Sequence, residues 1–130
     1  MVDLTIPAVP NTEQLSIVLN LSNWASVYTL DTARFLAQVR DYAGGGQLRY
    51  EWDTDGAAAS PASVTSYESV SGVLILRCPS SDMAAAFPPA LVALIGRTAM
   101  WELGFYLLEA PDDYIGIGIG KFPVTNGVVN

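Results

Sequence analysis

Histidine is absent from the 130 residues of this chain, and cysteine occurs once, at Cys78. Without histidine there is no Ser-His-Asp triad, no imidazole general base and no histidine-ligated metal. A single cysteine can form neither an internal disulfide nor a zinc cluster. These absences exclude a good deal of nucleophilic and metal-assisted chemistry, and we expect a non-enzymatic protein without a cofactor.

Basic residues are also scarce. Six lysines and arginines face thirteen aspartates and glutamates, which gives a formal net charge of −7. The basic residues are scattered singly along the chain, as Arg34, Arg40, Arg49, Arg77, Arg97 and Lys121. Nucleic-acid binding needs a basic stripe that neutralises phosphates, and an anionic membrane surface would repel this chain. We therefore expect neither nucleic acid nor membrane as a partner.

The N-terminal sequence lacks the basic segment and apolar run of a signal peptide. The longest uncharged apolar stretch, residues 83–96, is too short to span a bilayer and contains two prolines. We expect a soluble protein made in a reducing cytoplasm, with Cys78 buried and inert.

Apolar residues make up 51% of the chain and charged residues only 15%, so the chain is expected to fold around a core. Its length suits one domain, which buries roughly two-thirds of the unfolded surface. Apolar and polar residues alternate over residues 14–21, 34–42 and 47–52, the pattern of half-buried strands. Three glycines at 44–46 predict a hairpin between the last two of these strands.

Further strands are predicted at residues 64–68, 72–78, 98–109 and 114–124. An Ala/Ser/Pro-rich loop covers residues 53–63, and Pro111-Asp112-Asp113 predicts a turn. Ser80-Ser81-Asp82 can cap one or two helical turns over residues 83–86, which Pro88-Pro89 end. Residues 90–95 fit either a helical turn or a buried strand.

Seven or eight short strands with one short helical turn predict an all-β sandwich or barrel. A ferredoxin-like α+β fold is disfavoured, because no long amphipathic helix is visible. The sandwich domain is predicted to cover residues 14–125. Residues 1–13, which contain two prolines, are expected to form an extended N-terminal arm, and residues 126–130 a flexible tail.

Three glycines alternate with three isoleucines over residues 115–120, just before Lys121, and suggest a phosphate-binding loop. The spacing fails, since a Walker loop needs glycine in place of Ile115 and a hydroxyl residue in place of Phe122. The dinucleotide-binding fingerprint likewise needs glycine in place of Lys121. We interpret the segment as a strand with one smooth face, against which another backbone or an aromatic ring packs closely.

Glu51, Asp53, Asp55 and Gly56 match the first half of a calcium-binding EF-hand loop. The bidentate acid expected at the twelfth position is replaced by Ala62, and no flanking helices are predicted. A solvated turn after a strand is the plainer interpretation, and calcium binding by the two aspartates stays open.

Catalysis by other groups is also disfavoured. A small hydrolase would need a carboxylate pair such as Glu51 with Glu102 or Glu109, and no cleft is evident around them. Cys78 as a nucleophile lacks a histidine, and Arg77 is the only cation near it in the sequence.

Aromatic residues could line a sugar site or a protein interface; they include Trp24, Trp52, Trp101, Tyr28, Tyr42, Tyr50 and Tyr106. Most of them should lie in the core. Surplus apolar surface in a small all-β protein nevertheless favours an assembly contact. The candidate interface residues are Leu4, Ile6, Trp24, Trp52, Trp101 and Phe122.

Four segments carry a resemblance to a known family, namely Asp31-Thr32-Ala33-Arg34-Phe35-Leu36-Ala37-Gln38-Val39-Arg40, Ser71-Gly72-Val73-Leu74-Ile75-Leu76, Trp101-Glu102-Leu103-Gly104-Phe105 and Gly120-Lys121-Phe122-Pro123-Val124-Thr125. They resemble, in order, the T-A-x-x-x-Q-V-R, G-x-L-x-L, Y-D-L-x-F and G-x-x-x-V-T strands of small structural modules of tailed bacteriophages and prophages. These modules include the N-terminal domain of baseplate upper proteins. The resemblance covers roughly residues 15–127. Tryptophan and glutamate replace the usual Tyr-Asp, and residues 83–96 are longer and more apolar than the family's connection.

The resemblance implies an immunoglobulin-like β-sandwich and a role in virion architecture, after synthesis in the cytoplasm of a host bacterium. Such a tail, baseplate or connector component packs against copies of itself and other virion proteins, in a ring or lattice. The terminal arms would add strands to neighbours, so deleting residues 1–10 should weaken assembly and leave the monomer folded. A capsid decoration protein is the close alternative, and a carbohydrate- or receptor-binding module is another.

Overall fold

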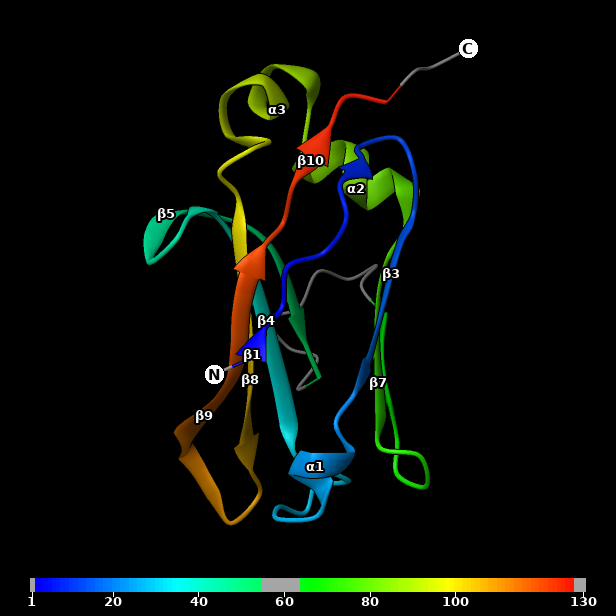
Figure 1. The fold of residues 1–130 in the computed structure, drawn as a ribbon, viewed down its shortest axis with the longest axis vertical. Coiled ribbons are helices and arrows are strands. Elements are labelled where there is room, and N and C mark those ends of the chain that lie inside the picture. The colour runs from blue at the N-terminus through cyan, green and yellow to red at the C-terminus, as the bar shows by residue number, and fades with distance from the viewer. Residues whose placement is uncertain (1, 55–63, 128–130) are drawn as a thin grey trace.

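The computed structural model of this protein describes residues 2–54 and 64–127, and most of these residues form β-strands (Figure 1). The strands are β1 (Val2–Asp3), β2 (Val9–Pro10), β3 (Leu15–Asn20), β4 (Arg34–Tyr42), β5 (Gly45–Asp53), β6 (Val64–Glu68), β7 (Val73–Cys78), β8 (Met100–Leu107), β9 (Ala110–Lys121) and β10 (Val124–Thr125). The helices are α1 (Ser22–Ala25), α2 (Ser80–Ala86) and α3 (Pro89–Ile95). The predicted all-β class is confirmed.

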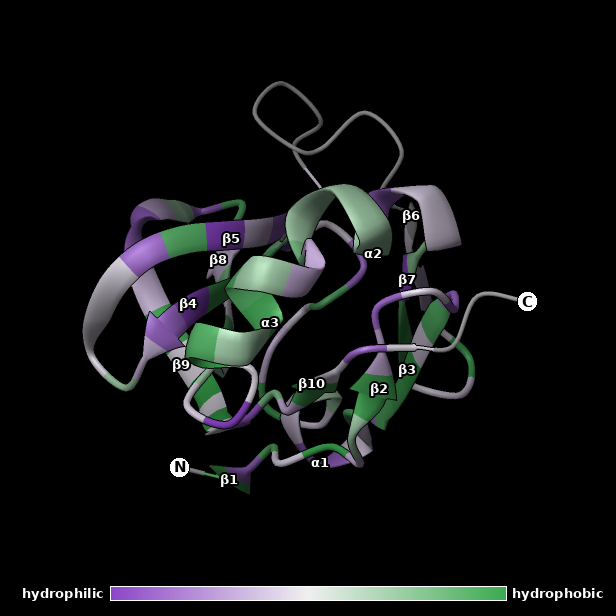
Figure 2. Ribbon diagram, turned by 90° about the horizontal axis from the view of Figure 1, so that it is seen from above, coloured by the Kyte–Doolittle hydropathy of each residue, from purple (hydrophilic) through white to green (hydrophobic). Residues whose placement is uncertain are grey.

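Two main sheets face each other across the core. The larger sheet has the strand order β1-β9-β8-β4-β5 and the smaller one β3-β7-β6, while β2 and β10 form a separate pair. The long strands pair antiparallel within each sheet. One end of the long axis carries α1, and α2 and α3 lie across the other end (Figures 1 and 2).

Alternate residues of the strands fill the space between the sheets, as the sequence pattern predicted. The buried side chains of β4 are Phe35, Ala37 and Val39, and those of β7 are Leu74, Leu76 and Cys78. In β3, Ile17 is buried while its neighbour Val18 is 64% exposed. The period of two residues therefore identified the inner face of these strands.

An aromatic cluster occupies the centre of this core. The ring centroids of Trp52 and Trp101 lie 6.3 Å apart, and Phe122 lies 6.3 Å from Trp101. Phe87, between α2 and α3, stacks on Phe122 at 5.9 Å. The indole N–H of Trp52 donates to the carbonyl of Arg77 at 2.8 Å and so joins the two sheets. Each such aromatic pair adds about 0.5–1.5 kcal/mol beyond its burial.

The N-terminal segment is extended, but it pairs with the chain's own strands instead of projecting as an arm. β1 runs parallel to β9, and β2 runs parallel to β10. The N–H of Leu4 donates to the carbonyl of Ile119 at 3.0 Å, and Leu4 is only 7% exposed. The domain thus includes residues 2–13, and loss of residues 1–10 would remove part of the core of the monomer.

Glycines of β9 allow this close approach, as the smooth-face interpretation predicted. A Cβ added to Gly120 would lie 2.1 Å from backbone atoms of Leu4 and Thr5. Trp101 is paired with Gly120, and its indole N–H donates to the carbonyl of Leu4 at 2.8 Å. The missing side chain therefore leaves room for a buried hydrogen bond between β8 and the N-terminal segment.

The helices differ from the single short turn that was predicted. Residues 90–95, for which the sequence fits either a helical turn or a buried strand, belong to the helix α3. This helix begins at Pro89 and buries Val92 and Ile95. Proline at the first helical position has a fixed φ that suits a helix start. α2 has Pro79 as its N-cap residue and no side-chain cap, so the predicted capping residues 80–82 form its first turn instead; the Pro79 carbonyl accepts the N–H groups of Asp82 and Met83. Both helices bury apolar side chains that the sequence could not orient.

One of the two predicted turns also differs in position. The β8–β9 turn consists of Leu108 and Glu109, whereas residues 111–113 lie within β9. Pairing with β8 passes from Ala110 to Tyr114, so the predicted turn residues form an irregularity in the ladder instead. The predicted β4–β5 hairpin is confirmed, with β5 beginning at Gly45.

The loop and tail predictions are only partly covered by the described residues. β5 continues through Asp53, and residues 55–63 lie outside the described ranges. At the C-terminus, the N–H of Gly127 donates to the buried side chain of Asn11 at 2.8 Å. Residue 127 is thus fixed to the N-terminal segment, and residues 128–130 lie outside the described ranges.

Gly120→Ala is expected to lower the free energy of unfolding by about 1–3 kcal/mol, because its methyl group overlaps the backbone of Leu4 and Thr5. Urea unfolding followed by tryptophan fluorescence measures the change. Ser16→Ala, at an exposed position of β3, serves as control and should stay within about 0.5 kcal/mol of the wild type. A Gly120→Ala protein as stable as the control would contradict this placement of the N-terminal segment.

Candidate functional site

Most of the candidate interface residues are core residues. Four of the six are buried, namely Leu4, Trp52, Trp101 and Phe122. A buried side chain offers no surface to a partner of the folded monomer, so these four candidates are corrected to structural residues. Ile6 is half-buried beside β9, and Trp24 is half-buried with its ring centroid 6.2 Å from that of Phe105.

Asp53, a candidate calcium ligand, forms an ion pair with Arg34 of the same chain. Asp53 is 4% exposed, and Arg34 donates to its two carboxylate oxygens at 2.9 and 2.6 Å. The ion pair balances the charge of the buried carboxylate and uses both oxygens. Asp55 lies outside the described residues, and within residues 2–54 and 64–127 no group of three acidic or cysteine side chains could hold a metal ion.

The candidate catalytic groups are dispersed or shielded. Glu51 accepts a 2.6 Å hydrogen bond from Gln38, Glu102 lies on the far side of Gln38 in β8, and Glu109 lies in the β8–β9 turn. Cys78 is buried as predicted, and burial raises the pKa of its thiol to about 11. The thiol is therefore protonated at neutral pH and is a poor nucleophile.

The outer face of the larger sheet brings together aromatic residues that the sequence did not connect. The strand register places Tyr106 between Arg34 and Tyr114. The Arg34 guanidinium lies 5.4 Å from the centroid of the Tyr106 ring, and the two tyrosine rings lie 5.4 Å apart. The ring of Tyr114 covers Gly104, where an added Cβ would meet it at 2.3 Å.

A shallow hollow of about 370 Å³ opens beside the two tyrosines, between Leu36, Gln38 and Glu102. Burial, followed by the nearby Glu102 and Tyr106, raises the pKa of Tyr114 to about 12, so its hydroxyl stays protonated. No pattern within a single strand indicates that Tyr106 and Tyr114 meet, because their contact depends on the irregular pairing of β8 with β9.

One end of the sandwich combines apolar and acidic side chains, and we call it the acidic end. Three large apolar residues are exposed there, Val27 (72%), Val70 (95%) and Leu108 (69%). They lie in the turns after α1, between β6 and β7, and between β8 and β9, which gather at one end of the long axis (Figure 1). Exposed carboxylates in or beside these turns are Asp31, Glu68, Glu109, Asp112 and Asp113. No lysine or arginine occurs in residues 22–33, 68–73 or 107–113.

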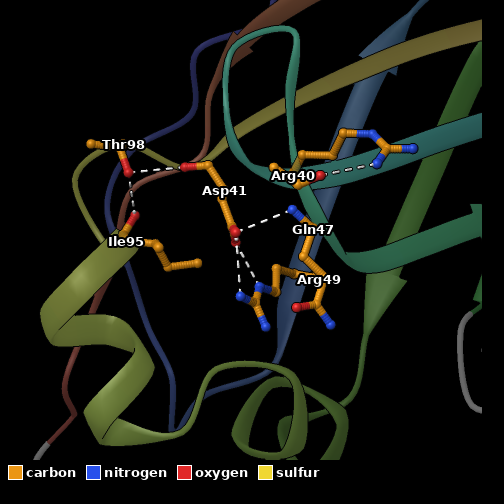
Figure 3. A network of polar contacts seen from close by, with 7 residues as sticks. Arg40, Asp41, Gln47, Arg49, Ile95 and Thr98 are labelled. Atoms are coloured by element: carbon orange, nitrogen blue, oxygen red, sulfur yellow. Dashed lines mark hydrogen bonds and ion pairs between the residues drawn. The ribbon is translucent and has the colours of Figure 1, made fainter.

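The opposite end is organised around α3. The Thr98 hydroxyl donates to the carbonyl of Asp41 at 2.9 Å and so ties the segment after α3 to the β4–β5 hairpin (Figure 3). The Asp41 carboxylate accepts a 2.6 Å bond from Arg49 and a 3.1 Å bond from the N–H of Gln47. Its hydrogen bond with Arg49 contributes most to lowering the pKa of Asp41 below the usual value.

A hollow of about 720 Å³ lies beside α3, and we call it the α3 hollow. It is lined by residues 92–94, 96–98 and 123–126, together with Ala8. Leu94 in this lining is 79% exposed, and Arg97 is the one ionisable residue of the lining. The two ends of the molecule therefore differ. The acidic end exposes apolar and acidic side chains, whereas the other end carries the α3 hollow with Arg97 in its lining.

No protein-family model matches this chain, and no curated protein sequence is significantly similar to it. None of the helices within the described ranges is long and apolar enough to cross a membrane.

Asp41→Asn should destabilise the protein at neutral pH by up to about 1 kcal/mol, because it removes the charge that pairs with Arg49. A lowered pKa means that ionised Asp41 stabilises the fold above its unfolded pKa, and that this contribution is lost as the pH falls through the folded pKa. Urea unfolding of both proteins across the acidic range should show the difference shrinking below pH 3.8, the usual value. A constant difference down to the lowest pH would contradict the assignment.

Proposed function

We propose that this protein is a non-enzymatic structural component of a bacteriophage virion, in the tail, baseplate or connector. It acts by packing against copies of itself and against neighbouring virion proteins. The observation that carries the proposal is the exposure of large apolar side chains at both ends of the sandwich, at Val27, Val70 and Leu108 on one side and Leu94 on the other. Large apolar residues exposed together mark protein contacts.

The proposal includes an immunoglobulin-like fold, which the strand order supports. The smaller sheet β3-β7-β6 corresponds to strands B, E and D of that fold, and β9-β8-β4-β5 corresponds to G, F, C and C′. The helices α2 and α3 are a departure, because they fill the connection between the strands equivalent to E and F.

The resemblance to phage tail modules supports the same proposal. Its four segments coincide with β4, β7, β8 and the passage from β9 to β10, which together supply much of the core. A capsid decoration protein would use the same fold and the same kind of contacts, so it is the alternative position in the virion.

The virion assignment predicts that the protein remains with purified particles. A lysogen that carries the gene is induced, and particles, separated heads and separated tails are purified on density gradients and quantified by mass spectrometry. We expect a fixed ratio of this chain to a known tail protein in particles and tails. Presence in heads alone would show the decoration role instead. Presence only in the soluble fraction would contradict both positions.

Carbohydrate binding is a second candidate, favoured by the hollow beside Tyr106 and Tyr114. The tryptophan platform predicted for this role is not available, because Trp52 is 1% exposed and Trp24 packs on Phe105. The tyrosine rings offer apolar faces to a sugar, and polar groups beside them can bind its hydroxyls.

Tyr114→Ala is expected to weaken saccharide binding by about tenfold, since it removes one of the two rings. Amide NMR titrations with a panel of bacterial cell-wall and exopolysaccharide fragments measure this. Tyr42→Ala, at a ring 56% exposed on the β4–β5 hairpin, is the matched control and should have no effect. Absence of shifts around the hollow with every saccharide would dismiss this candidate.

A further inference from the structure

We infer that copies of this chain associate head to tail, with the β8–β9 turn of one copy seated in the α3 hollow of the next. The inference rests on the proposed structural role and specifies the contact through which the copies assemble. The inferred contact joins Leu108 to Leu94 by apolar packing and Glu109 to Arg97 as an ion pair.

The β8–β9 turn has the chemistry of an inserted element. Its two residues are Leu108, which is 69% exposed, and Glu109, which is also exposed. Tight turns between strands favour glycine, asparagine and aspartate, because these residues adopt the turn conformation and are compatible with water. A large apolar side chain at the tip of such a turn is explained by a partner that covers it.

The α3 hollow has the complementary chemistry. Its lining is mostly apolar, its volume is about 720 Å³, and Arg97 is its one ionisable residue. Within the described ranges, neither salt bridge of the protein involves Arg97, since they join Arg34 to Asp53 and Arg49 to Asp41. An incoming apolar side chain would pack against this lining, and a carboxylate next to it would pair with Arg97.

The walls of the hollow are fixed before any partner arrives. The N–H of Val124 donates to the carbonyl of Gly96 at 2.9 Å, which joins β10 to the end of α3. A Cβ added to Gly96 would lie 2.4 Å from the carbonyl oxygen of Val124, so the two segments are in close contact. Thr98 is bonded to Asp41 on the other side (Figure 3). A preformed site loses little conformational entropy on binding.

Charge favours a head-to-tail arrangement over a symmetric pair. Two acidic ends that faced each other would bring together ten carboxylates, five from each copy, without a basic residue in their turns. The turns of the acidic end and helix α3, which contributes to the lining of the hollow, lie at opposite ends of the long axis (Figure 1). Contacts between two different surfaces are heterologous, and they produce a closed ring or an open filament according to the rotation between copies.

Charge reversal at the two sides of the contact tests the inference. Sedimentation velocity is measured up to about 1 mM protein. Arg97→Glu and Glu109→Arg should each weaken self-association about tenfold or more, and the double variant should recover it to within about threefold. Leu108→Ser should also weaken it. Glu13→Arg is the matched control for Glu109→Arg, because it makes the same charge change at an exposed residue outside both surfaces. Circular dichroism verifies the fold of each variant.

A wild-type protein that stays monomeric up to about 1 mM would overturn the inference. So would single reversals that associate as strongly as the control, or a double variant that shows no recovery. Retention in particles is measured separately. A chain that stays with particles but does not respond to the reversals would remove the head-to-tail contact and leave the virion role. A chain that responds but is missing from particles would remove the virion role and leave the contact.

Discussion

The buried hydrogen bond from the Trp101 indole to the Leu4 carbonyl is the contact on which the closure of this fold depends. It joins residues 97 positions apart and exists because Gly120, the partner of Trp101 in β9, has no side chain to keep the N-terminal segment away. Leu4 then enters a core in which Trp101 already contacts Trp52 and Phe122. A buried carbonyl without this donor would cost about 1–3 kcal/mol.

This closure decides where assembly contacts can lie. The N-terminal segment is already paired with β9 and β10, and Trp52 and Trp101 are in the core, so the paired segment does not extend as an arm and these two tryptophans offer no surface to a neighbour. Among the described residues, the four most exposed large apolar side chains lie instead at the two ends: Val27, Val70 and Leu108 at the acidic end, and Leu94 beside Arg97 in the α3 hollow. A chain with a net charge of −7 repels its own copies unless an acidic surface meets a cationic one, and the head-to-tail contact provides this arrangement.

Patterns among neighbouring residues of the chain predicted the strands, their buried faces and one hairpin. Alternation identified the long strands and their buried faces, and the glycine run predicted the β4–β5 hairpin. The failed spacing of the phosphate-binding motifs favoured a strand over residues 115–120, which lie in β9. The partners of these strands depend on tertiary contacts. The parallel pairing of β1 with β9, the burial of α3 against the core and the meeting of Tyr106 with Tyr114 across an irregular ladder have no local signal. Large apolar side chains are typical of interfaces and also of cores, so residue type alone does not separate the buried candidates Leu4, Trp52, Trp101 and Phe122 from true interface residues.

Hydrogen–deuterium exchange, compared in dilute and concentrated protein, tests most directly whether the N-terminal segment belongs to the fold and the ends form the contacts. The amides of Leu4 and Ile6 should be protected in the dilute monomer, where they donate to the carbonyls of Ile119 and Lys121. Protection gained on association should be concentrated in residues 94–98 and 107–113. Free exchange of residues 2–6 in the monomer, with protection only after association, would contradict this placement of the segment and show that it is an arm for neighbouring copies.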